Sequence, residues 1–213
     1  KQNEETDMLF DTLALISLIV ILLLIRKMIN IFPSLAACLI RWKENVNLQL
    51  SLKMRTDRNK LTCALFIPFS LTVFQYRLYC PQFLGNMADT SRLWCTIGIV
   101  AAYAMIRVAC RLAFRMKTPT TTIYTAATDS VRTYFIILTL LLVTTGGLLS
   151  FFEVPASHIR TAMFWLSGSI YALFLLRKTQ IFLSSCNLFV SFLYLCALEI
   201  LPTGVLIASA FIF

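Results

Sequence analysis

The run LFDTLALISLIVILLLI, from Leu9 to Ile25, decides the fold class of this chain. It is apolar almost throughout and carries one charged residue, Asp11. An α-helix rises about 1.5 Å per residue, so a run of this kind nearly crosses the ~30 Å hydrocarbon core of a bilayer. Backbone amides cannot stay unpaired in lipid, and the run lacks the alternation that a barrel strand needs. It therefore predicts a transmembrane helix.

Apolar runs of similar character recur along the chain. Hydrophobic residues make up 59% of the sequence and charged residues 14%, against about 45–50% and about 25% in soluble domains, and the mean hydropathy is +0.79. We therefore expect an all-α, polytopic transmembrane helix bundle of about six spans, forming a single membrane domain over residues 1–213. The spans predicted after Leu9–Ile25 are Leu61–Tyr79, Leu93–Ala113, Thr133–Phe152, Pro155–Leu176 and Cys186–Ala210.

The basic residues indicate how such a bundle is oriented. Most of the 19 Lys and Arg residues fall in segments 26–60, 107–132 and 177–178, which six spans would place on one face. Cytoplasmic loops carry the excess of Lys and Arg, so we expect this face in the cytoplasm and both termini outside. This asymmetry, together with attraction to anionic lipid head groups, explains the formal net charge of +9 without nucleic-acid binding.

The basic segment 26–60 begins with the pattern of a helix. In PSLAACLIRWKEN, Leu35, Leu39 and Trp42 recur at three- and four-residue spacing. Pro33 precedes them, and proline suits the first turn of a helix. The pattern predicts a short amphipathic helix on the cytoplasmic surface of the membrane.

From Val46 to Arg55 the period changes, because VNLQLSLKMR alternates strictly between apolar and polar residues. As a strand it would present one apolar face, and a lone strand needs a partner. One interpretation is β-addition to another copy of the chain or to another protein. The other is a helix that continues along the membrane surface. The residues of the predicted partner-binding face are Val46, Leu48, Leu50, Leu52 and Met54.

Three charged residues fall inside predicted spans, where charges are rare and point to function. At about 1.5 Å of rise per residue, Glu199 lies about 20 Å and Arg77 about 24 Å from the predicted inner face. Arg107 lies about 9 Å from that face in a ~30 Å core. We therefore expect Arg77 to contact Glu199 in the outer half of the bundle. Arg107 would pair near the inner face with Asp129 or extend inward beside Arg111.

Pro202 follows Glu199 closely and has no N–H, so the carbonyl of Leu198 loses its helical donor and a kink is expected. Glu199, Thr203 and that carbonyl would then form a polar notch beside Gly204. Broken helices of this kind line ion sites in transporters. The alternative is a kink that joins helices and binds nothing.

Cysteine and histidine give little support for a metal or a catalytic site. Cys80 and Cys95 flank the predicted outer loop between the second and third spans, where a disulfide would form if that side is oxidising. No C-x-x-C pair occurs and His158 is the single histidine, so we expect no metal and no cofactor. G-x-S-x-G, P-loop and dinucleotide motifs are missing as well, so the chain is not expected to be an enzyme.

The C-terminal run NLFVSFLYLCALEILPTGVLI, Asn187 to Ile207, carries a family resemblance. Its core, Leu195 to Pro202, resembles the closing segment of an uncharacterised multi-spanning inner-membrane family of Bacteroidetes, catalogued as a domain of unknown function. The layout of one N-terminal span, a basic segment and then a bundle is similar too. The resemblance implies a bacterial inner-membrane location, so that the outside face predicted for both termini would be the periplasm, and it transfers no activity.

Two functional hypotheses follow. The first is a non-enzymatic subunit or assembly factor of a membrane protein complex, because no catalytic constellation is present and the alternating segment needs a partner. Its partners would be the lipid bilayer and other membrane subunits or further copies of the chain. The second is a small transporter or channel that uses the polar notch at Glu199 and Pro202.

Overall fold

The computed structural model describes residues 2–79, 81, 84, 87–113, 121–184 and 188–212. Within these residues every regular element is helical, which confirms the predicted all-α bundle. In chain order the elements are α1 (Gln2–Ile40), α2 (Trp42–Leu50), α3 (Leu52–Ala64), α4 (Phe66–Gln75), α6 (Asp89–Ala113), α7 (Thr121–Phe151), α8 (Ala156–Leu183), α9 (Leu188–Leu195), the π-helical turn η1 (Cys196–Ile200) and α10 (Leu201–Ile212).

Among the described residues, five helical stretches are long and apolar enough to cross a membrane. Each overlaps one of the six predicted spans, and several extend past the predicted bounds. The five stretches are Met8–Ile40, Asp89–Ala113, Thr125–Phe151, Ala156–Leu183 and Ser191–Ala210.

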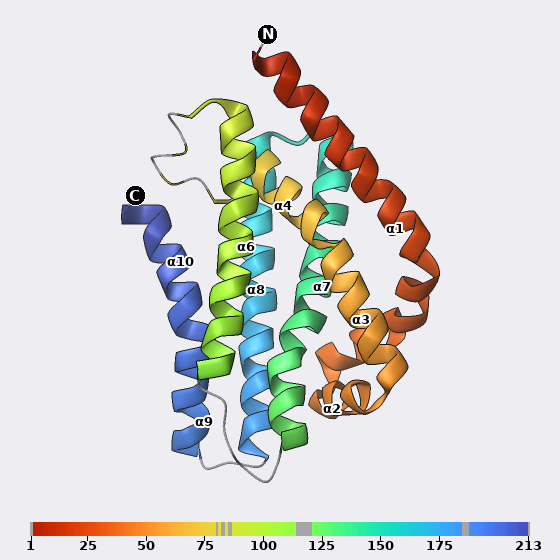
Figure 1. Ribbon diagram of the computed structural model, residues 1–213, viewed down its shortest axis with the longest axis vertical. Helices are drawn as coiled ribbons and strands as arrows, with labels where there is room; N and C mark the ends of the chain where they lie inside the picture. The colour runs from red at the N-terminus through yellow and green to blue at the C-terminus, as the bar shows by residue number, and fades with distance from the viewer. Residues whose placement is uncertain are drawn as a thin grey trace.

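The remaining predicted span, Leu61–Tyr79, is not one continuous helix. α3 ends at Ala64, Leu65 forms the joint, and α4 runs on to Gln75. Pro68 lies in the first turn of α4 and has no N–H to offer the carbonyl of Ala64, which favours a break at this point. Together α3 and α4 still lead from the lower part of the bundle to its upper end (Figure 1).

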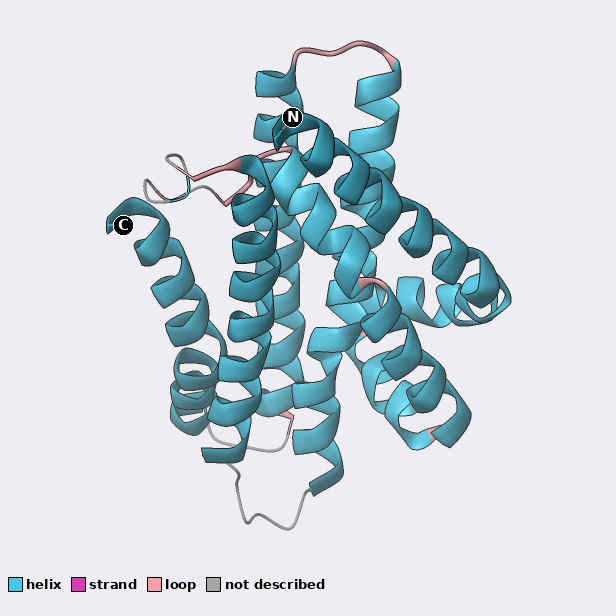
Figure 2. Cartoon of the chain, turned by 45° about the horizontal axis from the view of Figure 1, so that its top comes forward, coloured by secondary structure: helices cyan, strands magenta, loops and turns pink. Residues whose placement is uncertain are grey.

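The helices run up and down along the long axis of the molecule (Figure 1). α6, α7 and α8 occupy the middle, α1 slants along one side, and α9, η1 and α10 form the opposite side. Both termini lie in the upper half, whereas α2 lies low. The turned view shows the same arrangement of helices joined by loops (Figure 2). This placement of the termini agrees with an even number of crossings, while the assignment of one face to the cytoplasm stays a prediction.

α7 packs on both of its sides. On one side Ile136 of α7 lies in a buried cluster with Ile31 of α1 and Leu48 of α2. On the other side α7 lies against α8, where a Cβ added at Gly146 would stand 2.6 Å from Cε of Met163. The small residue therefore permits the close approach of these two helices.

The segment predicted as a partner-binding strand is helical, which corrects the β-addition hypothesis. Leu48 is buried at 2% exposure, whereas Leu50 and Leu52 are 67% and 76% exposed. Met54 packs against the same buried cluster as Leu48, and the side chain of Val46 lies outside the described part of the chain. A helix turns about 100° per residue, so alternating apolar residues separate onto different faces. The sequence pattern is typical of a strand, but packing against α7 stabilises helices in this segment.

Ser51 makes the bend between α2 and α3, with an extended backbone at φ −84° and ψ 110°.

The short amphipathic helix predicted to start at Pro33 is not a separate element, because α1 runs through Pro33 and ends at Ile40. Leu35 is buried in the cluster shared with α7. The apolar face of this part of α1 therefore packs against the rest of the bundle and does not lie on the membrane surface as predicted.

Candidate functional site

Glu199 lies on the π-helical turn η1, between α9 and α10, and it is 2% exposed. Pro202 explains the wide turn, since its ring would clash with the carbonyl of Leu198 in a regular helix and it donates no hydrogen bond. The N–H of Leu201 donates to the carbonyl of Cys196 instead. The kink expected at this position is thus present as a π turn, a feature frequently found at functional sites.

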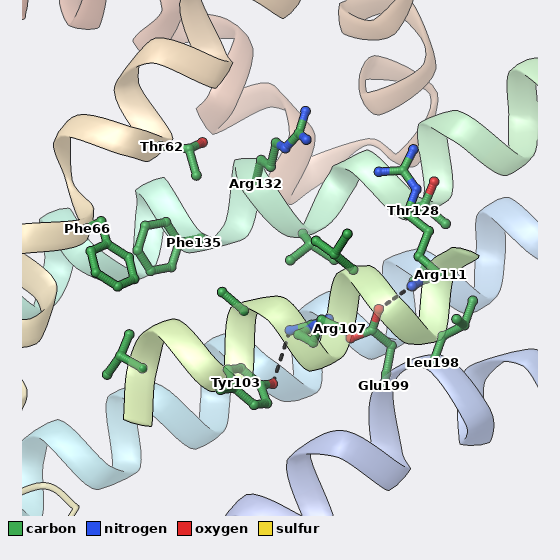
Figure 3. A pocket seen from close by; sticks show the side chains of 15 residues that line it. Thr62, Phe66, Tyr103, Arg107, Arg111, Thr128, Arg132, Phe135, Leu198 and Glu199 are labelled. Carbon is green, nitrogen blue, oxygen red and sulfur yellow. Dashed lines mark hydrogen bonds and ion pairs between the residues drawn. The ribbon is translucent and has the colours of Figure 1, made fainter. Parts of the chain in front are cut away.

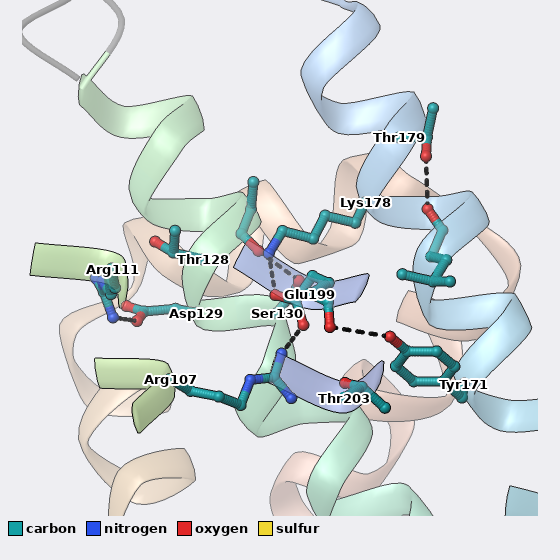
Figure 4. A network of polar contacts seen from close by, with 12 residues as sticks. Arg107, Arg111, Thr128, Asp129, Ser130, Tyr171, Lys178, Thr179, Glu199 and Thr203 are labelled. Atoms are coloured by element: carbon teal, nitrogen blue, oxygen red, sulfur yellow. Dashed lines mark hydrogen bonds and ion pairs between the residues drawn. The ribbon is translucent and has the colours of Figure 1, made fainter. Parts of the chain in front are cut away.

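Two cations from neighbouring helices converge on the Glu199 carboxylate (Figure 4). Lys178 of α8 directs Nζ to Oε1, and Arg107 of α6 directs Nη2 to Oε2. Lys178 is 1% exposed, so its charge is removed from solvent as completely as that of Glu199. Burying one charge without the other would be costly, and the three residues therefore form one electrostatic unit that joins α6, α8 and η1.

Hydroxyl groups complete the surroundings of this unit. The hydroxyl of Tyr171 donates to the backbone carbonyl of Glu199 at 3.3 Å. Nη1 of Arg107 donates to the hydroxyl of Tyr103 at 3.1 Å, and that hydroxyl lies 2.9 Å from Oγ1 of Thr203. Thr203 thus belongs to the site, as the sequence predicted for the polar notch.

The predicted contact between Arg77 and Glu199 is wrong. Arg77 is exposed in the turn after α4, with φ at 49°, and Arg107 occupies the position assigned to it. The depth estimate took all helices to start in one plane, whereas α9 begins below the lower end of α6 in Figure 1. That offset brings Glu199 down to the level of Arg107.

Asp129 of α7 forms a second charged centre beside the first. Nη1 of Arg111 contacts Oδ1 of Asp129 at 2.7 Å, and Nη2 of Arg58 lies 3.6 Å from Oδ2. Nη1 of Arg132 lies 3.8 Å from Oδ1. The predicted inner-face partner of Asp129 was Arg107, and the structure places Arg111 there. Burial lowers the pKa of Arg58 to about 10 although Asp129 opposes this shift, so the guanidinium stays charged at neutral pH.

A cavity of about 240 Å³ adjoins both centres (Figure 3). Among the described residues, Glu199 is the one carboxylate in its lining, and the rest of the lining is mainly apolar and aromatic, including Phe66 and Phe135. Because cations outnumber acids around this space, the cavity is suited to an anionic group. Its cationic lining residues are Arg107, Arg111, Arg132 and Lys178.

Sequence reasoning missed Lys178 and Arg58. The fifth span was expected to end at Leu176, which left Lys178 in a loop. Phe174 and Ile181 stand at helical spacing from Lys178, and both are buried. This apolar spacing in the sequence could have indicated that the helix continues past Leu176 with Lys178 on its buried face. Arg58 lies in the polar run MRTDRNK, where no residue type or spacing distinguishes it from other surface cations.

Two further predictions, the disulfide and the absence of a metal, stay predictions. Cys80 lies outside the described residues, so a disulfide with Cys95 stays a prediction. Among the residues that the structure describes, no group of three or more His, Cys, Asp or Glu side chains is placed to hold a metal ion.

Comparison with known proteins bears on the family. Searches of curated proteins and of solved structures find no match. A family model described as Domain of unknown function (DUF4271) matches residues 9–209. This agrees with the resemblance to a family of unknown function, while an origin in Bacteroidetes and an inner-membrane location stay predictions. Since the match spans nearly the whole sequence, the chain belongs to this family, a domain family of unknown function.

Proposed function

We propose that the protein is a small membrane transporter that binds an anionic ligand in the cavity beside Glu199. The observation that carries this proposal is the excess of cations around that cavity, where Arg107, Arg111, Arg132 and Lys178 meet two described carboxylates, Glu199 in the lining and Asp129 beside it. Charges held inside a membrane protein are costly unless they are paired. An anion bound in the cavity would offset the excess positive charge around it.

The backbone around Glu199 supports movement at the site. A π turn next to Pro202 interrupts the helix within the apolar stretch Ser191–Ala210, and interrupted helices form the binding sites of many transporters. Glu199 serves as a built-in counter-ion for Lys178 and Arg107. An incoming anion would exchange with this carboxylate, and the segment from α9 to α10 would shift as the exchange occurs.

Thermal unfolding in detergent tests the binding step, with inorganic phosphate and acetate as probe anions. A ligand at 100 times its Kd stabilises a protein by about 2.7 kcal/mol, so we expect a rise in Tm for the unmodified chain. Lys178→Gln should lose this rise. The matched control is Arg160→Gln, because Arg160 is exposed on the same helix and lies outside the cavity lining. No rise in Tm with any anion would overturn the proposal.

Flux measurements in reconstituted vesicles separate transport from static binding. Uptake of the labelled anion should depend on Lys178 and persist in Arg160→Gln. Binding without uptake would leave an anion-binding membrane protein that does not transport.

The subunit or assembly role stays a separate prediction. One argument for this role was that Val46 to Arg55 would form a strand that pairs with another chain. This argument no longer holds, because these residues belong to α2 and α3 and the bend between them. Purification in mild detergent tests the hypothesis, which expects a partner at fixed stoichiometry or a defined oligomer.

A further inference from the structure

We infer that the anionic ligand is an amphiphile, an acidic lipid whose head group enters the cationic cavity and whose chain lies along α6. This inference rests on the proposed anion site and adds its chemical class. Two independent features support it. One is an apolar groove on α6 that adjoins the cavity, and the other is the grouping of arginines at one end of the cavity.

The groove is a shallow, open hollow on the surface of α6, lined by described residues of that helix. Ala104 and Val108 line both the groove and the cavity, so the two spaces meet at these residues. Met105 and Leu112, which also line the groove, are largely exposed. They belong to the membrane-spanning stretch Asp89–Ala113. The cavity therefore adjoins an apolar hollow on a surface that a bilayer would cover.

A small soluble anion would make no contact with this apolar hollow. Such an anion would contact the cationic residues of the lining and leave the apolar walls at Phe66 and Phe135 without a ligand group against them. A ligand with a hydrocarbon chain can keep that chain beside the apolar side chains of α6, which are as apolar as lipid tails, while its charged end reaches the cations of the cavity. The combination of charged end and apolar groove favours one molecule with both characters.

The charged end suits a phosphate. Arg111 and Arg132 line the cavity and share Oδ1 of Asp129, at 2.7 Å and 3.8 Å. Both side chains are about one-third exposed, so their guanidinium groups remain accessible. Guanidinium groups bind phosphate oxygens in a bidentate manner. Basic pockets between transmembrane helices on the cytoplasmic side bind acidic lipid head groups, and the predicted orientation places this end on that side.

Native mass spectrometry tests the inference on chain released from vesicles of equal parts phosphatidylglycerol and phosphatidylcholine. We expect phosphatidylglycerol to be retained preferentially. Ala109→Trp fills the groove, which Ala109 lines without lining the cavity, and should abolish retention, while leaving the rise in Tm with inorganic phosphate unchanged. The matched control is Ile106→Trp, because Ile106 is exposed on the same helix and lines neither space.

The head-group end is tested with Arg111→Gln and Arg132→Gln. Each removed cation should lower phosphatidylglycerol retention about fivefold, and Arg160→Gln should not. Equal retention of the two lipids, or unchanged retention in the Arg111→Gln/Arg132→Gln chain, overturns the amphiphile inference. If inorganic phosphate still stabilises the protein in that case, the proposed anion site stands. If neither phosphate nor phosphatidylglycerol binds, the proposed function fails as well.

Discussion

Glu199 shows how one buried carboxylate can organise three helices. It meets Lys178 of α8 and Arg107 of α6, and Tyr171 donates to its backbone carbonyl. None of these partners is its neighbour in sequence, so the identity of the partners is a property of the packed bundle. The charge in an apolar run was a sound signal for a site, although it did not identify the partner.

The pairing can be measured with a double-mutant cycle. Glu199→Gln leaves two cations without their carboxylate and should destabilise the protein by about 3–5 kcal/mol. Adding Lys178→Gln should cost about 1–3 kcal/mol less than the sum of the single changes, because the two residues interact directly. Unfolding of the purified protein in detergent gives the four free energies.

Arg77→Ala is the control for this cycle. Arg77 is exposed and remote from the site, so its change should add to that of Glu199→Gln within about 0.5 kcal/mol. A coupling as large as that of Lys178 would restore the pairing first predicted from depth and would refute the structural assignment.

The α2–α3 pair shows how packing decides an element that local pattern leaves open. Strict alternation from Val46 to Arg55 is typical of a strand, yet α2 and α3 are helices with a bend at Ser51. Helical geometry gives Leu48 a place in the core and turns Leu50 away from it. Contact with α7 makes the helical alternative more favourable, because it buries apolar side chains within the same chain.

Alanine substitution distinguishes the two geometries. Leu48→Ala removes a buried side chain and should destabilise the protein by about 2–5 kcal/mol. Leu50→Ala alters an exposed side chain and should change stability by less than about 0.5 kcal/mol. The free energy of unfolding in detergent provides the comparison. Similar effects at both positions would indicate one shared face, as in a strand.

At the scale of the whole molecule, both termini lie in the upper half in Figure 1, whereas α2, which belongs to the basic segment 26–60, lies low. The excess of Lys and Arg in 26–60 predicts that the end of the molecule with α2 faces the cytoplasm.

Cysteine labelling measures this orientation in intact cells. Thr56 is exposed in α3 within the basic segment, and Ser157 is exposed near the start of α8 at the opposite end. With a membrane-impermeant maleimide, Ser157→Cys should react in intact cells and Thr56→Cys only after permeabilisation. The reverse pattern would invert the topology and move the arginine-rich end of the cavity to the outer face.

Composition and hydrophobic run length by themselves determined the class of this protein, because a helix long and apolar enough to span a bilayer leaves its backbone no good alternative in lipid. They also indicated Glu199, Pro202 and Thr203 as a polar site, since charge and proline stand out in an apolar run. Only the tertiary structure decided that Arg107 and Lys178 share the Glu199 carboxylate and that 46–55 is helical. Both outcomes depend on the relative height and rotation of packed helices, which no single segment encodes.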